Sequence, residues 1–257
     1  MQLHWHTEPF LIISILGVAW LYTLLMGPLR SRFSGAPERM PWTAYNCFQT
    51  GLALAYISVA SPLDQIGEQF LFSAHMVQHM ILVYVCPPLM IYGLPWWLVD
   101  PLFRVKGLGL VFRKLFHPLV GGMTFSTVYT VWHIPLLYEM ALQDKTIHII
   151  EHLTMFGTGW MMLWMVFSQS KEIPISNPGV RMIGVFLLMV AQLPVFAFLT
   201  LSDAVLYPTY DWAPRIIPGF EALPDQILGG VIMKISNMVF SLSVFAYAFF
   251  TWAKHES

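Results

Sequence analysis

Two pairs of histidines are spaced so that each pair lies on one face of a helix. His75 and His79 are four residues apart, and so are His148 and His152. Residues four apart on a helix have Cβ atoms about 5–6 Å from each other, so both imidazoles of a pair can face one ion. Neutral imidazole is a common metal ligand in proteins. The spacing therefore predicts a metal site that two neighbouring helices build together.

Sulfur side chains accompany both pairs. On a helical wheel of about 100° per residue, Cys86 and Met90 fall within about 60° of the first histidine pair. Met155 and Met162 fall on the face of the second pair in the same way. Thioether and thiolate ligands favour Cu(I) over harder ions. We therefore expect the metal to be copper.

Further residues border this predicted site. Met76 and Met80 point about 100° away from the first histidine pair and can border the ion. His133 precedes Ile-Pro, so it either binds the metal or ends a helix. His4 and His6 reach the ion only if the N-terminal segment folds back. The full set of candidate ligands is His75, His79, His148, His152, His133, Met76, Met80, His6 and His4.

Charged residues are sparse, and long runs of the chain lack them. Of 257 residues, 57% are hydrophobic and 11% are charged, whereas a soluble domain usually carries about 25% charged residues. A run of 18 or more apolar residues is typical of a membrane-spanning helix. We therefore expect an all-α, polytopic membrane protein that forms one domain over residues 1–257. Seven spans are predicted at about residues 9–29, 43–61, 70–92, 118–137, 148–168, 181–201 and 226–252.

The basic residues indicate how these spans are oriented. Cytoplasmic loops of membrane proteins carry an excess of Lys and Arg. Alternate loops of a seven-span chain hold ten basic residues on one side and only Lys145 and Arg215 on the other. The larger set is Arg30, Arg32, Arg39, Arg104, Lys106, Arg113, Lys114, Lys171, Arg181 and Lys254. We therefore place the N-terminus outside and the C-terminus in the cytoplasm of a multi-pass protein.

This topology gathers the histidines at one face. Seven of the nine lie near the outer side, and only His117 and His255 fall on the cytoplasmic side. The outer loops also hold most of the acidic residues, which would attract cations toward the histidines. The net charge of −1 indicates no particular partner, and two cysteines cannot form a disulfide framework. Nothing in the sequence indicates nucleic-acid binding.

Several motifs occur in the order known from one family. They are Trp5-His6-Thr7-Glu8-Pro9, Ser61-Pro62-Leu63-Asp64, the stretch from His75 to Met80, His133-Ile134-Pro135-Leu136-Leu137-Tyr138-Glu139, the stretch from His148 to His152, and Asp225-Gln226-Ile227-Leu228-Gly229-Gly230. With these motifs the chain resembles the CtaG family of bacterial cytochrome c oxidase assembly factors. Those seven-span proteins are associated with caa-type haem–copper oxidases. The resemblance covers nearly the whole chain.

The resemblance implies an assembly role in the bacterial cytoplasmic (inner) membrane and no enzymatic activity. We expect the protein to capture Cu(I) near the outer face and to pass it by ligand exchange to haem–copper oxidase subunits. An extracytoplasmic copper donor would supply the ion. The oligomeric state is left open by the sequence.

Other functions remain compatible with the sequence. A b-type cytochrome would bind haem between two histidines of facing helices, although an i, i+4 pair is redundant for that purpose. A copper transporter would carry the ion across the membrane along the sulfur side chains Cys86, Met90 and Met162. A copper or iron oxidoreductase is the least expected, because we find no carboxylate cluster within the spans to build a di-iron site.

Overall fold

The computed structural model describes residue 5 and residues 7–256, with backbone only for residues 255 and 256. Within this part of the chain all regular elements are helices and no strand occurs. The helices are α1 (Pro9–Met26), η1 (Arg30–Arg32), α2 (Trp42–Ala60), α3 (Pro62–Gln69), α4 (Phe72–Met80), the π-helical turn η2 (Ile81–Val85), α5 (Cys86–Tyr92), α6 (Trp96–Phe103), α7 (Leu108–Leu115), α8 (Pro118–Trp132), α9 (Pro135–Gln143), α10 (Lys145–Phe167), α11 (Pro178–Ala191), α12 (Leu193–Thr200), α13 (Pro208–Trp212) and α14 (Ala222–Glu256). The prediction of an all-α chain is confirmed.

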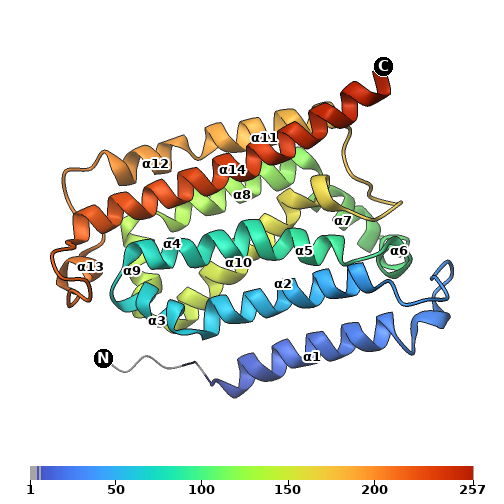
Figure 1. The fold of residues 1–257 in the computed structure, drawn as a ribbon, viewed down its shortest axis with the longest axis horizontal. Coiled ribbons are helices and arrows are strands. Elements are labelled where there is room, and N and C mark those ends of the chain that lie inside the picture. The colour runs from blue at the N-terminus through green and yellow to red at the C-terminus, as the bar shows by residue number, and fades with distance from the viewer. Residues whose placement is uncertain (1–4, 6, 257) are drawn as a thin grey trace.

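The long helices lie side by side along the long axis of the molecule and alternate in direction (Figure 1). The short helices α3, α9 and α13 lie at the left-hand end in this view, and α6 and α7 lie at the other end. Helices α4, η2 and α5 follow each other without a break and form one rod near the centre. The loops thus alternate between two ends of one helical bundle.

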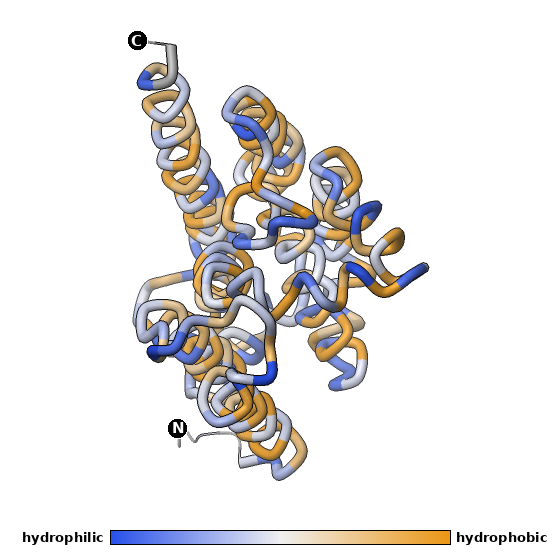
Figure 2. Tube along the Cα trace, turned by 90° about the vertical axis from the view of Figure 1, so that its right-hand side faces the viewer, coloured by the Kyte–Doolittle hydropathy of each residue, from blue (hydrophilic) through white to orange (hydrophobic). Residues whose placement is uncertain are grey.

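Much of the bundle's outer surface is apolar. Seen from one end, hydrophobic residues occupy large parts of the helices' outward sides (Figure 2). Phe10 and Trp20 are 84% and 67% exposed, and many other large apolar side chains are exposed as well. In the described residues, four helical stretches are long and apolar enough to cross a membrane: Pro9–Met26, Phe72–Tyr92, Pro178–Thr200 and Ala222–Lys254. These features are those of a membrane protein.

Helix α10 also has the length of a span, with 23 residues, but it is less apolar. Glu151 and His152 lower the hydropathy of its first half. Both residues belong to the region where the metal site is predicted. Ionisable groups inside a long apolar helix are rare and usually face the interior for a functional reason.

Two of the predicted spans are divided in the structure. The stretch 118–137 contains α8, which ends at Trp132, and the start of α9. The break falls at His133 and Ile134 because Pro135 disfavours the helical conformation of the residue before it. The stretch 181–201 is divided at Gln192, where Pro194 begins the next helix within its first turn.

The π-helical turn η2 changes which side chains lie below the first histidine pair. A π turn inserts an extra residue into the helix and rotates everything beyond it. Met90 packs with Phe48 and Leu52 of α2, and a Cβ atom at Gly51 would lie 2.6 Å from the Met90 Cγ. Met90, which a regular α-helix would place on one stripe with the histidines, thus packs against α2.

Candidate metal centre

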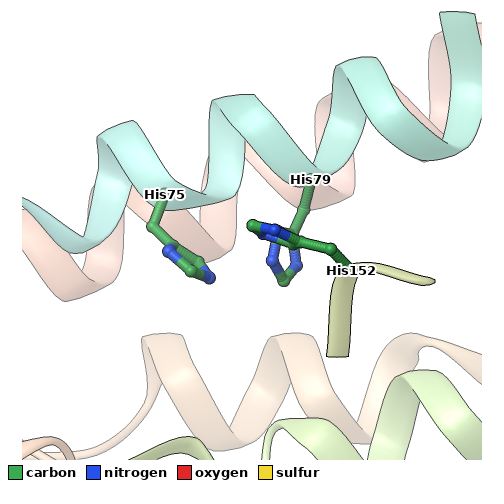
Figure 3. Close-up of side chains that lie close together, drawn as sticks. All are labelled: His75, His79 and His152. Carbon is green, nitrogen blue, oxygen red and sulfur yellow. The ribbon is translucent and has the colours of Figure 1, made fainter. Parts of the chain in front are cut away.

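The two histidine pairs meet across the interior of the bundle. Ring centroids are 4.3 Å apart for His75 and His79 and 4.2 Å apart for His148 and His152. Between the helices, the His79 and His152 rings are 5.1 Å apart and the His75 and His148 rings 5.5 Å. Figure 3 shows His75 and His79 of α4 facing His152 of α10. The convergence of the two helices that the spacing predicts is therefore present.

The ring nitrogens at this meeting point are buried without hydrogen-bond partners. His75 is 0% and His79 is 1% exposed, and none of their four ring nitrogens has a partner among the described residues. The Nε2 atoms of His148 and His152 are in the same state. Leaving a buried polar atom unsatisfied costs about 1–3 kcal/mol. Each neutral imidazole has one ring nitrogen with a free lone pair. Such a concentration of unpartnered ring nitrogens is what a site prepared for a cation requires.

A carboxyl group lies directly beside the imidazoles. Glu151 of α10 is 1% exposed, and its Oε1 is 3.7 Å from the Nε2 of His79 and 3.9 Å from that of His75. Neither of its oxygens has a hydrogen-bond partner among the described residues. Glu151 was not among the predicted ligands. Its position three residues after His148 places it on the same helical face, so the spacing rule could have found it.

Helix α3 adds acidic residues on the side of the cluster nearer the end of the bundle. The Nδ1 of His148 is 2.5 Å from Oε1 of Glu68. Asp64 is 6% exposed, and its Oδ1 accepts a hydrogen bond of 2.5 Å from Nε2 of Gln78. No carboxylate cluster is expected within the predicted spans, and only Glu151 of these carboxyl groups lies in one. Asp64 and Glu68 lie between the predicted spans, and α3 brings them to the histidines because it folds back against α4.

Three overlapping sets of potential ligands result from this arrangement. Within each set one ligand atom per residue lies within 4.8 Å of the others. The sets are His75, His79 and His152; Asp64, His148 and His152; and His75, His148 and Glu151. Nitrogen and oxygen donors of this kind bind transition metals such as copper and zinc.

Helix α4 is held in place by a residue distant in the sequence. Asp225, in the first turn of α14, accepts hydrogen bonds from the backbone amides of Phe72 (2.6 Å) and Ser73 (3.2 Å), and from the hydroxyl of Ser73. It thereby satisfies the free amides at the start of α4, as an N-cap residue does. In the same region Gly229 must lack a side chain, because a Cβ atom there would overlap the Phe72 ring. These contacts fix the position of the first histidine pair.

Replacing Asp225 by Ala is expected to destabilise the start of α4. Loss of a helix cap costs about 1–2 kcal/mol. Thermal unfolding of the purified protein in detergent would therefore shift to lower temperature, and metal affinity would fall because His75 loses its fixed position. Asp203→Asn, which changes an exposed acidic residue of the same end, serves as the control. An unchanged unfolding temperature in Asp225→Ala would show that this cap does not support the site.

Aromatic side chains cover the cluster on the side of α9 and α13. The hydroxyl of Tyr138 donates to that of Tyr210 (2.8 Å), which donates to the carbonyl of Gly67 (2.7 Å). The hydroxyl of Tyr207 donates to the carbonyl of His133 (3.0 Å), and the Tyr138 ring lies edge-on to His75. Burial raises the pKa of Tyr207 and Tyr210 well above the usual value, so both stay protonated and able to donate. These hydrogen bonds thus connect α9, α13, α3 and the end of α8 around the histidine cluster.

The other predicted ligands are placed differently. Met76 and Met80 are buried in the main apolar core, and the Met76 Cγ lies 3.2 Å from where a Cβ at Gly229 would stand. His133 ends α8, and its Nδ1 lies 2.6 Å from the carbonyl oxygen of Tyr129. Its Nε2 is buried without a partner, but His133 belongs to none of the three ligand sets. His4 and His6 lie outside the described residues. Cys86 belongs to none of the sets either.

A cavity in the opposite half of the bundle has a different character. It has a volume of about 510 Å³ and lies between α8, α10 and α11. Its walls include Leu119, Met123, Ile183 and Leu187, and no acidic residue lines it. Unlike the histidine cluster, this cavity therefore offers no carboxyl group to a cation.

The chain was compared with known protein families, curated proteins and solved structures. The model of the family described as cytochrome c oxidase caa3 assembly factor (Caa3_CtaG) matches residues 20–255. No curated protein and no solved structure gives a significant match. The family match spans both histidine pairs, Glu151 and Asp225 and covers nearly the whole chain. The chain therefore belongs to the family of cytochrome c oxidase caa3 assembly factors.

Proposed function

We propose that this assembly factor binds Cu(I) with His75, His79 and His152 and delivers it to a haem–copper oxidase. The observation that carries the proposal is that imidazoles from two helices converge with buried, unpartnered nitrogens. Imidazole is a suitable ligand for copper. The nearby carboxyl group of Glu151 would favour a positive charge at this position.

The donor set also suits an ion that must be released again. None of the three ligand sets contains a thiolate, so the site lacks the strongest soft ligand for copper. A carrier has to bind its cargo tightly enough to capture it and loosely enough to pass it on. We therefore assign the protein a non-catalytic role as a copper carrier, with oxidase subunits as acceptors and an extracytoplasmic protein as the copper donor.

We further propose a multi-pass arrangement in the bacterial cytoplasmic membrane, with seven spans. The rods α1, α2, α4–α5, α8–α9, α10, α11–α12 and α14 would cross the bilayer. The histidine end, with Lys145 and Arg215, would lie outside, and the end with the remaining loop Lys and Arg residues would lie inside. Reporter fusions at residues 106 and 203 test this: activity of a periplasmic reporter only at residue 203 is expected, and activity only at residue 106 would contradict it.

Two features favour a carried ion over the alternatives. Neighbouring rings of the four imidazoles have centroids 4.2–5.9 Å apart, which leaves no slot for a porphyrin between them. A transporter would need donors that continue across the bundle, but Met90 packs in an apolar cluster with Phe48 and Leu52 of α2. Both observations support binding and release at one end of the molecule.

The proposal is tested by oxidase maturation in cells. In a strain that lacks its own assembly factor, the wild-type protein is expected to restore the copper content and activity of the haem–copper oxidase. His75→Ala/His79→Ala is expected to fail although it accumulates in the membrane. His117→Ala changes an exposed histidine at the other end of α8 and should restore the oxidase fully. Full restoration by the double variant would contradict the proposal.

A further inference from the structure

Beside the three imidazoles lies a second set of donors, formed by Asp64, His148 and His152. One ligand atom from each of these residues lies within 4.8 Å of the other two. Asp64 and His148 are each 6% exposed, and the Nε2 atoms of His148 and His152 have no hydrogen-bond partner among the described residues. We infer that these residues form a second cation position, which receives the ion before it reaches His75 and His79.

The imidazole of His148 is oriented as a metal ligand. Its Nδ1 lies 2.5 Å from the carboxylate of Glu68, so Nδ1 carries the proton and donates it to this hydrogen bond. The lone pair is then on Nε2, the atom that is buried without a partner. Histidines that bind metals usually donate their other ring N–H to a carboxylate in this way. Glu68 is thus a positioning residue for the second cation position.

Asp64 is also held by a neighbour. Its Oδ1 accepts a hydrogen bond of 2.5 Å from Gln78, whose side-chain amide also donates to the carbonyl of Ser58 (3.0 Å). Helix α3 can approach α4 this closely because Gly67 has no side chain: a Cβ atom there would lie 2.9 Å from the Cα of His75. Carboxylates that bind metals are commonly oriented by such hydrogen bonds. Gln78 lies between His75 and His79 in the sequence. Helix α4 therefore carries two ligands of the inner position and also orients Asp64 of the second position.

The two positions have His152 in common. An ion that moves inward would exchange Asp64 and His148 for His75 and His79 while it stays bound to His152. The ion would never be without ligands along this path. Because the positions overlap and both would carry positive charge, we expect them to be occupied one at a time. As a step in copper transfer this inference rests on the proposed function, whereas the existence of the second position does not.

The donor types indicate how the second position can be observed separately. One carboxylate and two imidazoles form a harder set than three imidazoles, and mixed nitrogen and oxygen ligands suit Cu(II). Cu(II) is paramagnetic and shows coupling to ligand nitrogen nuclei. It therefore serves as the probe in the His75→Ala/His79→Ala protein, which has lost the inner ligands.

In this background Cu(II) is expected to give an electron paramagnetic resonance spectrum with coupling to two imidazole nitrogens. Adding Asp64→Asn is expected to weaken Cu(II) binding at least tenfold. Glu68→Gln, which leaves every proposed ligand in place, should weaken it by about 10–100-fold, as loss of a positioning partner does. Asp203→Asn should leave it unchanged, and thermal unfolding curves verify that each variant is folded. Equal Cu(II) binding with and without Asp64 would overturn the inference.

A second measurement links this position to loading. The rate of Cu(I) transfer from a coloured chelator is followed in protein with intact His75 and His79. Asp64→Asn is expected to load at least tenfold more slowly and to reach the same final Cu(I) content. An unchanged rate would contradict the proposed path. If His75→Ala/His79→Ala instead binds Cu(I) as the wild type does, the proposed function fails, while the Cu(II) result still decides the second position.

Discussion

Purified wild-type protein is expected to retain Cu(I) through gel filtration, and His75→Ala/His79→Ala is expected to lose it. The variant keeps only His152 of the three converging imidazoles. Loss of an outer-shell partner already lowers metal affinity by about 10–100-fold, and loss of two direct ligands should lower it further. Competition with a chelator of known Cu(I) affinity, under reducing conditions, measures the difference.

His117→Ala is the matched control for this experiment. It removes one imidazole from an exposed position far along α8 and should bind Cu(I) like the wild type. Thermal unfolding gives a second readout. At a Cu(I) concentration 100 times the dissociation constant, binding stabilises the folded state by about 2.7 kcal/mol. The wild type should show this shift and the double variant should not. Equal Cu(I) affinity in the wild type and His75→Ala/His79→Ala would show that the histidine cluster does not bind the ion.

Replacing Glu151 is expected to change stability and metal affinity in opposite directions. Glu151→Met replaces the unpartnered carboxyl group with an apolar side chain of similar size. An unsatisfied buried polar group costs about 1–3 kcal/mol, so the metal-free variant should unfold at a higher temperature than the wild type. Its Cu(I) affinity should fall at least tenfold, because the negative charge 3.7–3.9 Å from two of the ligand nitrogens is gone.

Glu151→Gln separates the effect of charge from that of polarity. Glutamine keeps the shape and the need for hydrogen bonds but carries no charge. Its metal-free stability should stay close to that of the wild type, and its Cu(I) affinity should fall as in Glu151→Met. A Glu151→Met protein that is less stable than the wild type without metal would show that the carboxyl group has a structural role.

The helical bundle and the two histidine pairs were predictable because they follow from short-range regularities. Apolar runs of span length gave the long helices, and i, i+4 spacing gave the two histidine pairs. The family match confirms the resemblance read from the ordered motifs. The predicted ranges agree with the long helices to within a few residues, apart from the breaks before Pro135 and at Gln192.

The environment of the ligands was not predictable in the same way. The turn η2 follows Met80 directly and rotates the chain beyond it, and Met90 packs against α2. A helical wheel contains no information about such a π turn. The expected position of Met90 below the first histidine pair was wrong for this reason.

Contacts between segments far apart in the sequence could not be predicted either. Asp225 is 153 residues from the amide of Phe72 that it caps, and no spacing rule connects the two. The acidic residues of α3 reach His148 only because Gly67 allows close approach to α4. The acidic character of this end of the protein was visible in the sequence as an excess of Asp and Glu in alternate loops. Which of those residues turn inward depends on tertiary packing.

The central claim is that imidazoles of α4 and α10 bind one copper ion together. X-ray absorption of the Cu(I)-loaded protein tests it most directly. We predict nitrogen ligands at about 2.0 Å with the outer-shell scattering of imidazole rings, and loss of imidazole scattering in both His79→Ala and His152→Ala. A shell dominated by sulfur, or a spectrum that neither variant changes, would contradict the claim.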